Sequence, residues 1–314
     1  MKVLITAPYF QPVVERFRPE FEARGVEMVV PPVRERMEEA DLLPLIGDIH
    51  GVICGDDRFT RRVLEAAPVL KVLSKWGTGI DSLDQDACRD LGIAIRNTRD
   101  AFSQAVGDTV LGLMLCFARN IPWMDKAMKR GHWEKIQGRC LHECTLGVVG
   151  VGDTGSAVVR RARAFGMRIL GNDIKDISPE FCRETGLVPT ALDDLLAQSD
   201  FVSSNCDLNE TSLHLFNDAR FARMKPGAVF INCARGPVVD EPALVRALEQ
   251  GRLAGAGLDV FEHEPLPHDS PLMAMDNVLL SPHNANSSPA AWERIHRSTL
   301  DHLFEELFPE GSRG

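Results

Sequence analysis

Residues 145–175 have the sequence TLGVVGVGDTGSAVVRRARAFGMRILGNDIK, and this stretch decides the fold. An apolar run leads into Gly150, Gly152 and Gly155, which have the spacing G-x-G-x-x-G. An amphipathic helical pattern follows, and then a second apolar run that ends at Asp173. A strand, a glycine turn, a helix and a second strand form one βαβ unit, so the stretch predicts a parallel sheet.

The glycine turn also predicts a dinucleotide site, which includes Asp153 and Thr154 of the same loop. Glycines let the backbone approach a pyrophosphate, which lies at the N-terminus of the following helix. Asp173 stands where an acid binds the ribose 2′-hydroxyl of NAD and would repel the 2′-phosphate of NADP. The sequence therefore predicts NAD as the cofactor, and the alternative is a glycine turn with a purely structural role.

Composition places the chain among ordinary globular proteins. Its 314 residues are many for one core, so two domains are expected. The net charge of −10 argues against nucleic acid or an anionic membrane as the main partner. No apolar run reaches the ~20 residues of a membrane span, and the start MKVLITAPYF has no cleavable signal pattern. We expect a cytoplasmic protein.

The eight cysteines are scattered and form no C-x-x-C pair. Cys140 and Cys144, in CLHEC, are the closest two, and they lack the second ligand cluster of a zinc site. Cysteines inside apolar runs behave as small hydrophobic residues. We therefore expect no metal site, and the composition fits a reducing compartment.

Strand and helix patterns alternate twice along the chain. Five short apolar runs occur in the first hundred residues, with helical patterns between them at 12–24, 35–46, 60–67 and 84–91. The segment 101–120 is apolar nearly all round and predicts a buried helix. The alternation then restarts and supplies a second set of six apolar runs, so the fold class is α/β with two doubly wound parallel sheets.

The last helix follows the second sheet, with Ser288 as its expected cap and Pro289 as its first residue. We expect this helix to return to the first domain. Residues 1–97 plus 286–314 would then form one domain and residues 98–285 the dinucleotide domain, with a hinge at the two crossings.

Three later apolar runs each end at a charged or titratable residue. Arg235 follows the first, Asp259 ends the second and precedes Glu264, and His283 follows the third. Each alone has an ordinary explanation, as a surface cation, a loop acid or a histidine that ends a strand. Ligands bind beyond the carboxyl ends of parallel strands, so together they predict an active site.

These motifs resemble the D-isomer-specific 2-hydroxyacid dehydrogenases, in the branch related to D-3-phosphoglycerate dehydrogenase. The resemblance covers essentially the whole chain and is carried by GVGDTG, NCARGPVVDEPAL, GLDVFEHEP and SPH. It implies a flavodoxin-like substrate domain beside a Rossmann NAD-binding domain. It also implies a catalytic triad of Arg235, Glu264 and His283, and cofactor contacts from a further set of residues: Cys206, Cys233, Ala234, Asp259 and His283.

The segment KWGTGID, 75–81, resembles the substrate loop of the same family, whose backbone N–H groups receive the substrate carboxylate. The implied substrate contacts are Lys75, Trp76, Gly77, Thr78, Gly79 and Arg235. Lysine is a flexible point charge, so Lys75 could bind a second anionic group of the substrate. The alternative is that Asp56 and Asp57, just after the preceding apolar run, neutralise it.

The implied reaction interconverts a small D-2-hydroxy acid and its 2-oxo acid by hydride transfer with NAD. Arg235 would bind the acid through its planar fork and polarise the carbonyl. His283 would exchange the proton, and Glu264 would fix the ring tautomer and raise the pKa of His283, because a nearby anion favours the charged form. The family resemblance, together with the apolar surface of residues 101–135, also implies a homodimer.

Several positions depart from the family pattern. Asn284 and Asn286 follow the histidine and are more polar than the residues usual there, and Asn205 and Asp207 stand for a usual His and Pro. Gly107 and Asp108 replace a usual Ala and Glu, and Lys75 replaces an Arg. These departures bear on cofactor affinity and on substrate identity, and they leave the triad intact.

Two other functions stay open. One is an NAD(H)-responsive binding protein like the corepressors that share this fold. The other is an oxidoreductase of a different anion, such as phosphite or formate. Formate enzymes usually carry a glutamine as partner of the histidine, so Glu264 disfavours formate but leaves phosphite possible.

Overall fold

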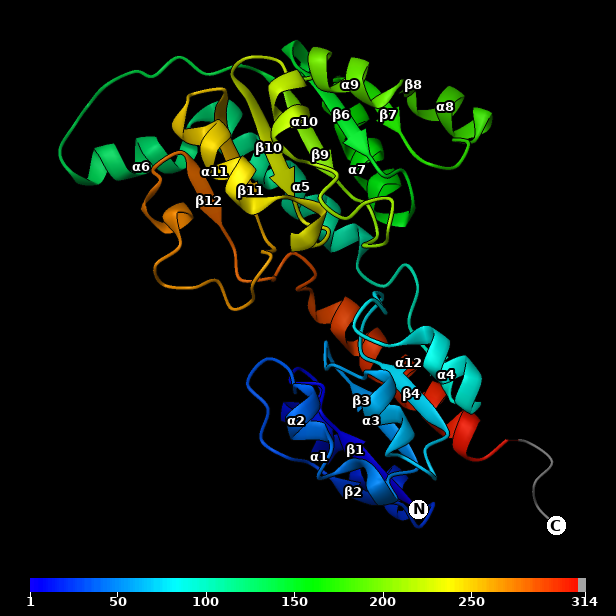
Figure 1. Cartoon of the computed structure of the whole chain (residues 1–314). Coiled ribbons are helices and arrows are strands. Elements are labelled where there is room, and N and C mark those ends of the chain that lie inside the picture. The colour runs from blue at the N-terminus through cyan, green and yellow to red at the C-terminus, as the bar shows by residue number, and fades with distance from the viewer. Residues whose placement is uncertain (310–314) are drawn as a thin grey trace. The chain divides into compact units, whose positions relative to one another are not determined.

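The structure, a computed structural model, describes residues 1–309. The chain divides into two compact units (Figure 1). The discontinuous unit comprises Met1–Ala101 and the segment from Ser288 on, and the central unit comprises Phe102–Ser287. Each unit contains one sheet whose strand pairs are all parallel, with five strands in the first and seven in the second. The predicted fold class is confirmed.

The discontinuous unit has the strand order β2-β1-β3-β4-β5, which is the flavodoxin-like order. Its strands are β1 Lys2–Ile5, β2 Glu27–Val29, β3 Gly51–Cys54, β4 Val72–Lys75 and β5 Ala94–Arg96. Every residue of β3 and β4 is buried, because helices cover both faces of the sheet. This double burial explains why β3 is a continuous apolar run without alternation, and why β4 begins with two apolar residues.

The helices of this unit are η1 Gln11–Val13, α1 Val14–Glu22, α2 Glu39–Leu42, η2 Ile46–Asp48, α3 Arg61–Glu65, α4 Gln85–Leu91 and α12 Pro289–Leu307. The expected helix at 35–46 is wrong in extent, since only residues 39–42 form one turn. Thr60 donates its hydroxyl to Glu39, at the first position of that turn, and Arg62 bonds the other oxygen of the same carboxylate.

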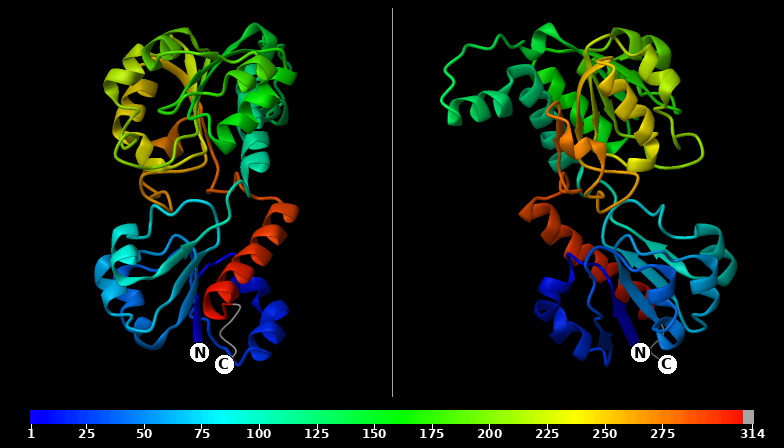
Figure 2. Two further views of the ribbon diagram at one scale, coloured as in Figure 1. Left: turned by 90° about the vertical axis from the view of Figure 1, so that its right-hand side faces the viewer. Right: turned by 60° about the vertical axis from the view of Figure 1, so that its left-hand side comes forward.

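Helix α12 packs on the sheet of the discontinuous unit, as Figure 2 shows. The Ser74 hydroxyl on β4 donates to the Thr299 carbonyl at 2.7 Å. Gly51 on β3 leaves room for Leu303, because an added Cβ would lie 2.8 Å from the leucine side chain. Ser288 stands at the N-cap, as predicted, although its side chain makes no capping bond. Pro289 is the first helical residue.

The central unit has the strand order β12-β11-β10-β9-β6-β7-β8. The part from β8 to β11 corresponds to the Rossmann order 3-2-1-4-5-6, and β12 extends it. Its strands are β6 Thr145–Val149, β7 Arg168–Asn172, β8 Val188–Pro189, β9 Phe201–Ser204, β10 Ala228–Asn232, β11 Leu253–Leu258 and β12 Val278–Leu280.

Helices cover both faces of this second sheet (Figure 1). They are α5 Ser103–Arg119, α6 Ile121–Lys129, η3 Leu141–Glu143, α7 Asp153–Ala164, α8 Pro179–Thr185, α9 Leu192–Gln198, α10 Asp218–Arg223, η4 Gly236–Val238, α11 Glu241–Glu249 and η5 Pro271–Ala274. In the described part of the chain, no helix is long and apolar enough to cross a membrane.

Two of the family departures lie where α5 packs on α7. Gly107 leaves room for Arg161, because an added Cβ would lie 3.1 Å from the guanidinium. Arg161 bonds Asp108 at 2.6 Å and Gln104 at 3.0 Å. A small residue and a shorter acid on α5 thus accommodate an arginine on α7.

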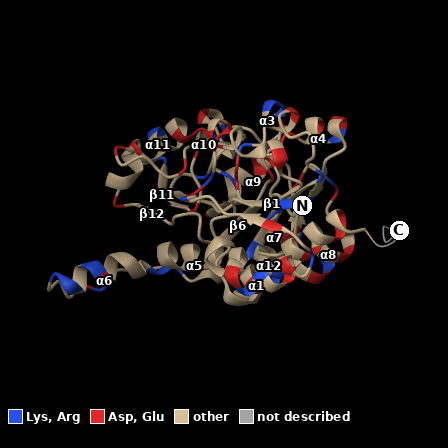
Figure 3. Ribbon diagram, turned by 90° about the horizontal axis from the view of Figure 1, so that it is seen from below, with Lys and Arg blue, Asp and Glu red and all other residues tan. Residues whose placement is uncertain are grey.

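Helix α6 and the following loop form an arm that extends from the central unit (Figures 2 and 3). No residue of α6 is buried. The arm carries four exposed large apolar side chains, and Trp133 is the most exposed at 82%. The other three are Ile121, Met128 and Ile136. We define residues 121–139 as the arm.

Asp200 connects several segments at the amino ends of the central strands. Its carboxylate accepts bonds from Arg139 at 2.9 Å, Lys225 at 2.7 Å and the Thr145 N–H at 2.8 Å. Burial alone would raise the pKa of Asp200, but these donors outweigh burial and lower the pKa to about 2.

We predict that Asp200→Asn lowers the free energy of unfolding by about 2 kcal/mol at pH 7, because the paired carboxylate is stabilised in the folded state. The aspartate pKa is lowered by folding, so this stability is present above the unfolded value of ~3.9 and is lost as pH falls toward 2. Urea unfolding at pH 7 and pH 3 measures it. If Asp200→Asn lowered the free energy of unfolding equally at both pH values, the charged Asp200 carboxylate would not be the source of this stability.

Candidate active site

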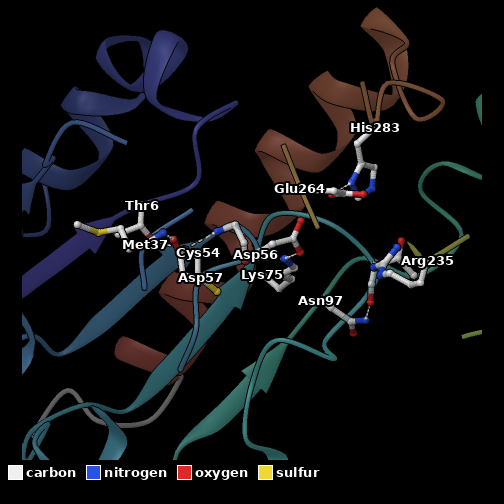
Figure 4. Close-up of polar contacts among 12 residues, drawn as sticks. Thr6, Met37, Cys54, Asp56, Asp57, Lys75, Asn97, Arg235, Glu264 and His283 are labelled. Carbon is white, nitrogen blue, oxygen red and sulfur yellow. Dashed lines mark hydrogen bonds and ion pairs between the residues drawn. The ribbon is translucent and has the colours of Figure 1, made fainter. Parts of the chain in front are cut away.

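The three predicted catalytic residues follow three neighbouring strands. Arg235 comes after β10, Glu264 lies in the loop after β11, and His283 comes after β12. These strands are parallel and adjacent, so the three loops leave the same edge of the sheet. Figure 4 shows the three side chains.

Glu264 and His283 form a hydrogen-bonded pair (Figure 4). The His283 Nδ1 lies 2.8 Å from Glu264 Oε2, and the Phe261 N–H donates to Glu264 Oε1 at 2.9 Å. Both oxygens of the carboxylate are therefore fixed, one by the ring and one by the backbone. Because Nδ1 is turned to the carboxylate, Nε2 is the ring nitrogen that points away from Glu264.

Asp259 holds the backbone that carries His283. Its buried carboxylate accepts the N–H groups of Asn284 at 2.8 Å and Ala285 at 2.9 Å. The His283 N–H donates to the Asp259 carbonyl at 2.7 Å, and His283 has a left-handed φ of +50°. These three bonds hold a backbone conformation that is unfavourable for residues other than glycine.

Arg235 begins a tight turn that Asn232 shapes. The Asn232 amide donates to the Arg235 carbonyl at 2.9 Å, and its oxygen accepts the Ala234 N–H at 3.1 Å. Asn232 is buried and is not among the predicted site residues. The signal for it was its place at the end of an apolar run, directly before the C-A-R-G segment.

The glycine loop has the form that a pyrophosphate site requires. Gly150 has φ +87°, and an added Cβ on Gly155 would lie 1.9 Å from the Gly150 carbonyl oxygen. An added Cβ on Gly152 would meet no atom within 4 Å, so the space beside this residue is open. Gly152 is the N-cap of α7, whose unpaired N–H groups favour an anion. The residues present fit a dinucleotide.

Asp173 lies just beyond β7 and is bonded to the glycine loop. Its Oδ2 accepts the Val151 N–H at 2.6 Å, and its Oδ1 accepts the Lys175 N–H at 2.9 Å. The carboxylate is thus held beside the loop on which the pyrophosphate would lie. This position suits the ribose contact that the sequence predicts.

The segment after β9 forms a further wall beside the glycine loop. An added Cβ on Gly150 would lie 2.8 Å from the Asn205 backbone. Burial raises the pKa of the Cys206 thiol to about 11, so the thiol is neutral at pH 7. The Asp207 carbonyl accepts the Ser212 hydroxyl at 2.6 Å. This bond stabilises the loop where the family usually has a rigid proline.

Cys233 and Ala234 follow β10, and Cys233 is buried. Burial raises the pKa of the Cys233 thiol, so it packs as a neutral group. Asp153 and Thr154 form the first turn of α7, next to Gly155. The predicted cofactor residues thus lie on the loops that follow β6, β7, β9, β10, β11 and β12 of one sheet, or in the first turn of α7.

The predicted substrate loop, 75–81, belongs to the discontinuous unit. Lys75 is only 3% exposed, and its ammonium bonds Asp56 and the Gly55 carbonyl (Figure 4). Trp76 is buried and donates to His296 at 3.0 Å. Of the two explanations for Lys75, neutralisation by Asp56 matches the observed pairing.

Asp57, the second predicted neutralising residue, has a different role. It accepts bonds from the Thr6 hydroxyl at 2.6 Å and from the N–H groups of Gly55 at 2.9 Å and Met37 at 2.7 Å. Burial raises the pKa of Asp57. The residue thus fixes the turn that presents Asp56.

Comparison with known proteins identifies the family. Residues 111–285 match the family described as D-isomer specific 2-hydroxyacid dehydrogenase, NAD binding domain. D-3-phosphoglycerate dehydrogenase of Methanocaldococcus jannaschii is 36% identical over 93% of this chain, which spans 54% of that protein. Glyoxylate reductase of Thermococcus onnurineus is 36% identical over 93% of this chain and 88% of its own length.

Among solved structures, the D-lactate dehydrogenase of Aquifex aeolicus, complexed with NAD and lactic acid, has a TM-score of 0.87. It is 26% identical, and the match covers 98% of this chain and 95% of that one. The chain therefore belongs to the D-isomer specific 2-hydroxyacid dehydrogenases, whose NAD-binding domain it carries in residues 111–285.

Proposed function

We propose that this protein interconverts a small D-2-hydroxy acid and its 2-oxo acid with NAD, using His283 as the acid and base. The observation that carries the proposal is the 2.8 Å bond between His283 Nδ1 and Glu264. It lies at the carboxyl edge of a sheet that belongs to an NAD-dependent 2-hydroxyacid dehydrogenase. NAD(H), when bound, accepts or supplies the hydride.

The glycine loop and α7 would hold the pyrophosphate, and Asp173 would bind the ribose. Gly152 and the first turn of α7 present backbone N–H groups to an anion. The Asp173 carboxylate is fixed by Val151 and Lys175 and retains acceptor capacity for the ribose hydroxyls. Its negative charge disfavours a 2′-phosphate, which supports NAD over NADP.

His283 would move the proton at Nε2. In the direction of reduction the ring begins as imidazolium, with Nδ1–H donated to Glu264. Nε2–H protonates the carbonyl oxygen of the 2-oxo acid as the carbon receives the hydride, which leaves a hydroxyl and a neutral ring. Glu264 stabilises the imidazolium because an anion at hydrogen-bond distance favours the charged ring.

Arg235 would bind the substrate carboxylate and polarise its carbonyl, since a guanidinium matches the planar fork of a 2-oxo acid. The Lys75 ammonium is already bonded to Asp56, so it does not supply a site for a second anion. This pairing favours a substrate with one carboxylate, such as glyoxylate or hydroxypyruvate, over phosphohydroxypyruvate.

We also propose that the protein is a homodimer and that the arm lies at its interface. The arm exposes four large apolar side chains, and burial of such a patch is favourable. We further propose that the protein is cytoplasmic. The eight cysteines of the chain are unpaired, which suits a reducing compartment.

We predict that His283→Ala lowers kcat/KM by roughly 10²–10⁴-fold, the usual contribution of a positioned acid–base group. The assay is NADH oxidation with glyoxylate, hydroxypyruvate, phosphohydroxypyruvate and pyruvate. NADH binding, measured by calorimetry, should be retained because the glycine loop is unchanged. The control is His268→Ala, which alters an exposed histidine on the β11–β12 loop and should keep full turnover.

Near-normal turnover of His283→Ala would remove His283 from the mechanism. A wild-type protein that binds NADH but turns over none of the four acids would instead favour the NAD(H)-responsive binding protein.

For the cofactor, we predict that the wild-type protein binds NADH more tightly than NADPH and that Asp173→Asn narrows the difference. Asparagine keeps an acceptor for the Val151 N–H but removes the charge that repels the 2′-phosphate. Fluorescence titration gives both dissociation constants. Tighter binding of NADPH by the wild-type protein would show that Asp173 does not face the ribose.

For the oligomer, we predict a dimeric mass at micromolar concentration and a shift toward monomer in the double variant Trp133→Glu/Ile136→Glu. Charges at these positions oppose burial of the arm. Light scattering after size exclusion measures the mass. Val188→Glu is the control and should remain dimeric, because it alters an exposed apolar residue on β8, at the opposite edge of the sheet from β12. A monomeric wild-type protein would refute the proposal.

A further inference from the structure

The central unit contains a second histidine–acid pair, which the proposed reaction does not use. The Nε2 atom of His214 lies 2.6 Å from Oε1 of Glu262. Glu262 is two residues before Glu264 on the same loop after β11, and His214 lies on the segment between β9 and α10. The pair therefore joins a neighbouring loop to the one that carries the partner of His283.

The backbone around Glu262 is fixed on two further sides. The Glu262 N–H donates to Glu241, the first residue of α11, at 3.2 Å. Burial and the nearby charge of Glu262 raise the pKa of Glu241. Gly236 packs closely against Phe261, the residue before Glu262. A Cβ added to Gly236 would lie 1.8 Å from the Phe261 carbonyl oxygen, so only glycine fits there. Phe261 and Glu262 thus lie between the turn after Arg235 and the start of α11.

The position of Phe261 sets the position of the Glu264 carboxylate. The Phe261 N–H donates to Glu264 Oε1 at 2.9 Å, while Glu264 Oε2 bonds His283. Residues 261–264 therefore form a closed turn, which we name the 261–264 turn. A displacement of its first half moves the carboxylate away from the His283 ring.

His214 is itself held by bonds to the loop after β10. Its N–H donates to the Pro237 carbonyl at 2.9 Å, and its carbonyl accepts the Asn217 amide at 3.2 Å. Its φ of +47° is in the left-handed region, which is uncommon for residues other than glycine, and the two backbone bonds help to hold it there. Pro237 is two residues after Arg235, so His214 connects the loops of both Arg235 and Glu264.

We propose that His214 and Glu262 are positioning residues that hold the 261–264 turn, so that Glu264 stays bonded to His283 Nδ1. The effect on catalysis rests on the proposed function of His283. The effect on the His283 ring does not, because it follows from the bonds within this one unit. Substrate and cofactor touch neither residue in this role.

An ordinary surface ion pair is the competing explanation. His214 is 50% exposed, and exposed pairs contribute little to stability. Glu262, however, is only 20% exposed, and its backbone is bonded independently of its side chain. A pair that only adds stability would change the unfolding midpoint and leave the protonation of His283 unchanged. The two explanations therefore differ in a measurable quantity.

The test follows the protonation of His283 in the cofactor-free protein by NMR of histidine labelled at ring carbon, with the signal assigned by its loss in His283→Gln. His214→Gly removes the imidazole and suits the left-handed backbone, so folding is retained. We expect its His283 titration midpoint to fall, because a displaced Glu264 stabilises the imidazolium less. Glu262→Ala should give the same fall.

Two further variants make the result specific. Glu264→Gln should lower the midpoint most, and adding His214→Gly to it should cause no further change, since the pair acts through Glu264. Asp218→Asn breaks the Asp218–Arg246 pair of the same unit, also bonded at 2.6 Å, and should leave the midpoint unchanged. In turnover assays His214→Gly should lower kcat about tenfold with KM within twofold, and should shift the pH profile to lower pH.

The proposal would be overturned if His283 had the same titration midpoint in His214→Gly as in the wild-type protein. It would also be overturned if adding His214→Gly to Glu264→Gln lowered the midpoint of His283 further. Absence of turnover in the wild-type protein would refute the proposed function alone, because the NMR titration needs neither substrate nor cofactor. Full turnover with an unchanged pH profile in both His214→Gly and Glu262→Ala would refute the positioning role and leave the proposed role of His283 standing.

Discussion

The hydrogen bond between Glu264 and His283 is the interaction on which the proposed chemistry depends. It turns Nδ1 of the ring to the carboxylate, and in the proposed mechanism Nε2 is the atom that exchanges the proton. The bond exists because two parallel strands, β11 and β12, end side by side at the same edge of the sheet. The pairing of the two strands thus brings together two residues that are 19 positions apart in the sequence.

The sequence predicted the two sheets well because apolar runs and the glycine spacing are both local features of the sequence. Fully buried parallel strands are continuous apolar runs, and the G-x-G-x-x-G spacing reflects the close approach of Gly155 to the Gly150 carbonyl. Predictions failed where contacts between distant segments decide whether a helix or strand forms. Only one turn forms within 35–46, and β8, which contains Pro189, escaped notice because it is a two-residue strand at the sheet edge.

Site residues were predictable where a strand end displayed them, and much less so where two loops meet. Arg235, Glu264 and His283 each follow an apolar run, which is visible in the sequence. Whether Lys75 would be neutralised by Asp56 could not be decided from spacing, because the bond requires the relative height of two strand ends, β3 and β4. The bond between His214 and Glu262 joins segments that follow two different strands and has no sequence signal.

Both histidines of the two histidine–acid pairs have left-handed backbone, with φ +50° at His283 and +47° at His214. Such a conformation is unfavourable for a side chain with a Cβ and persists only when surrounding bonds fix it. At His283 those bonds come from Asp259, and at His214 from Pro237 and Asn217. In each pair, backbone hydrogen bonds fix the main chain that carries the histidine, and a carboxylate bonds one nitrogen of its ring. A fixed main chain and a fixed ring nitrogen together keep the imidazole in one orientation. At His283 the proposed proton transfer at a single ring nitrogen requires such an orientation.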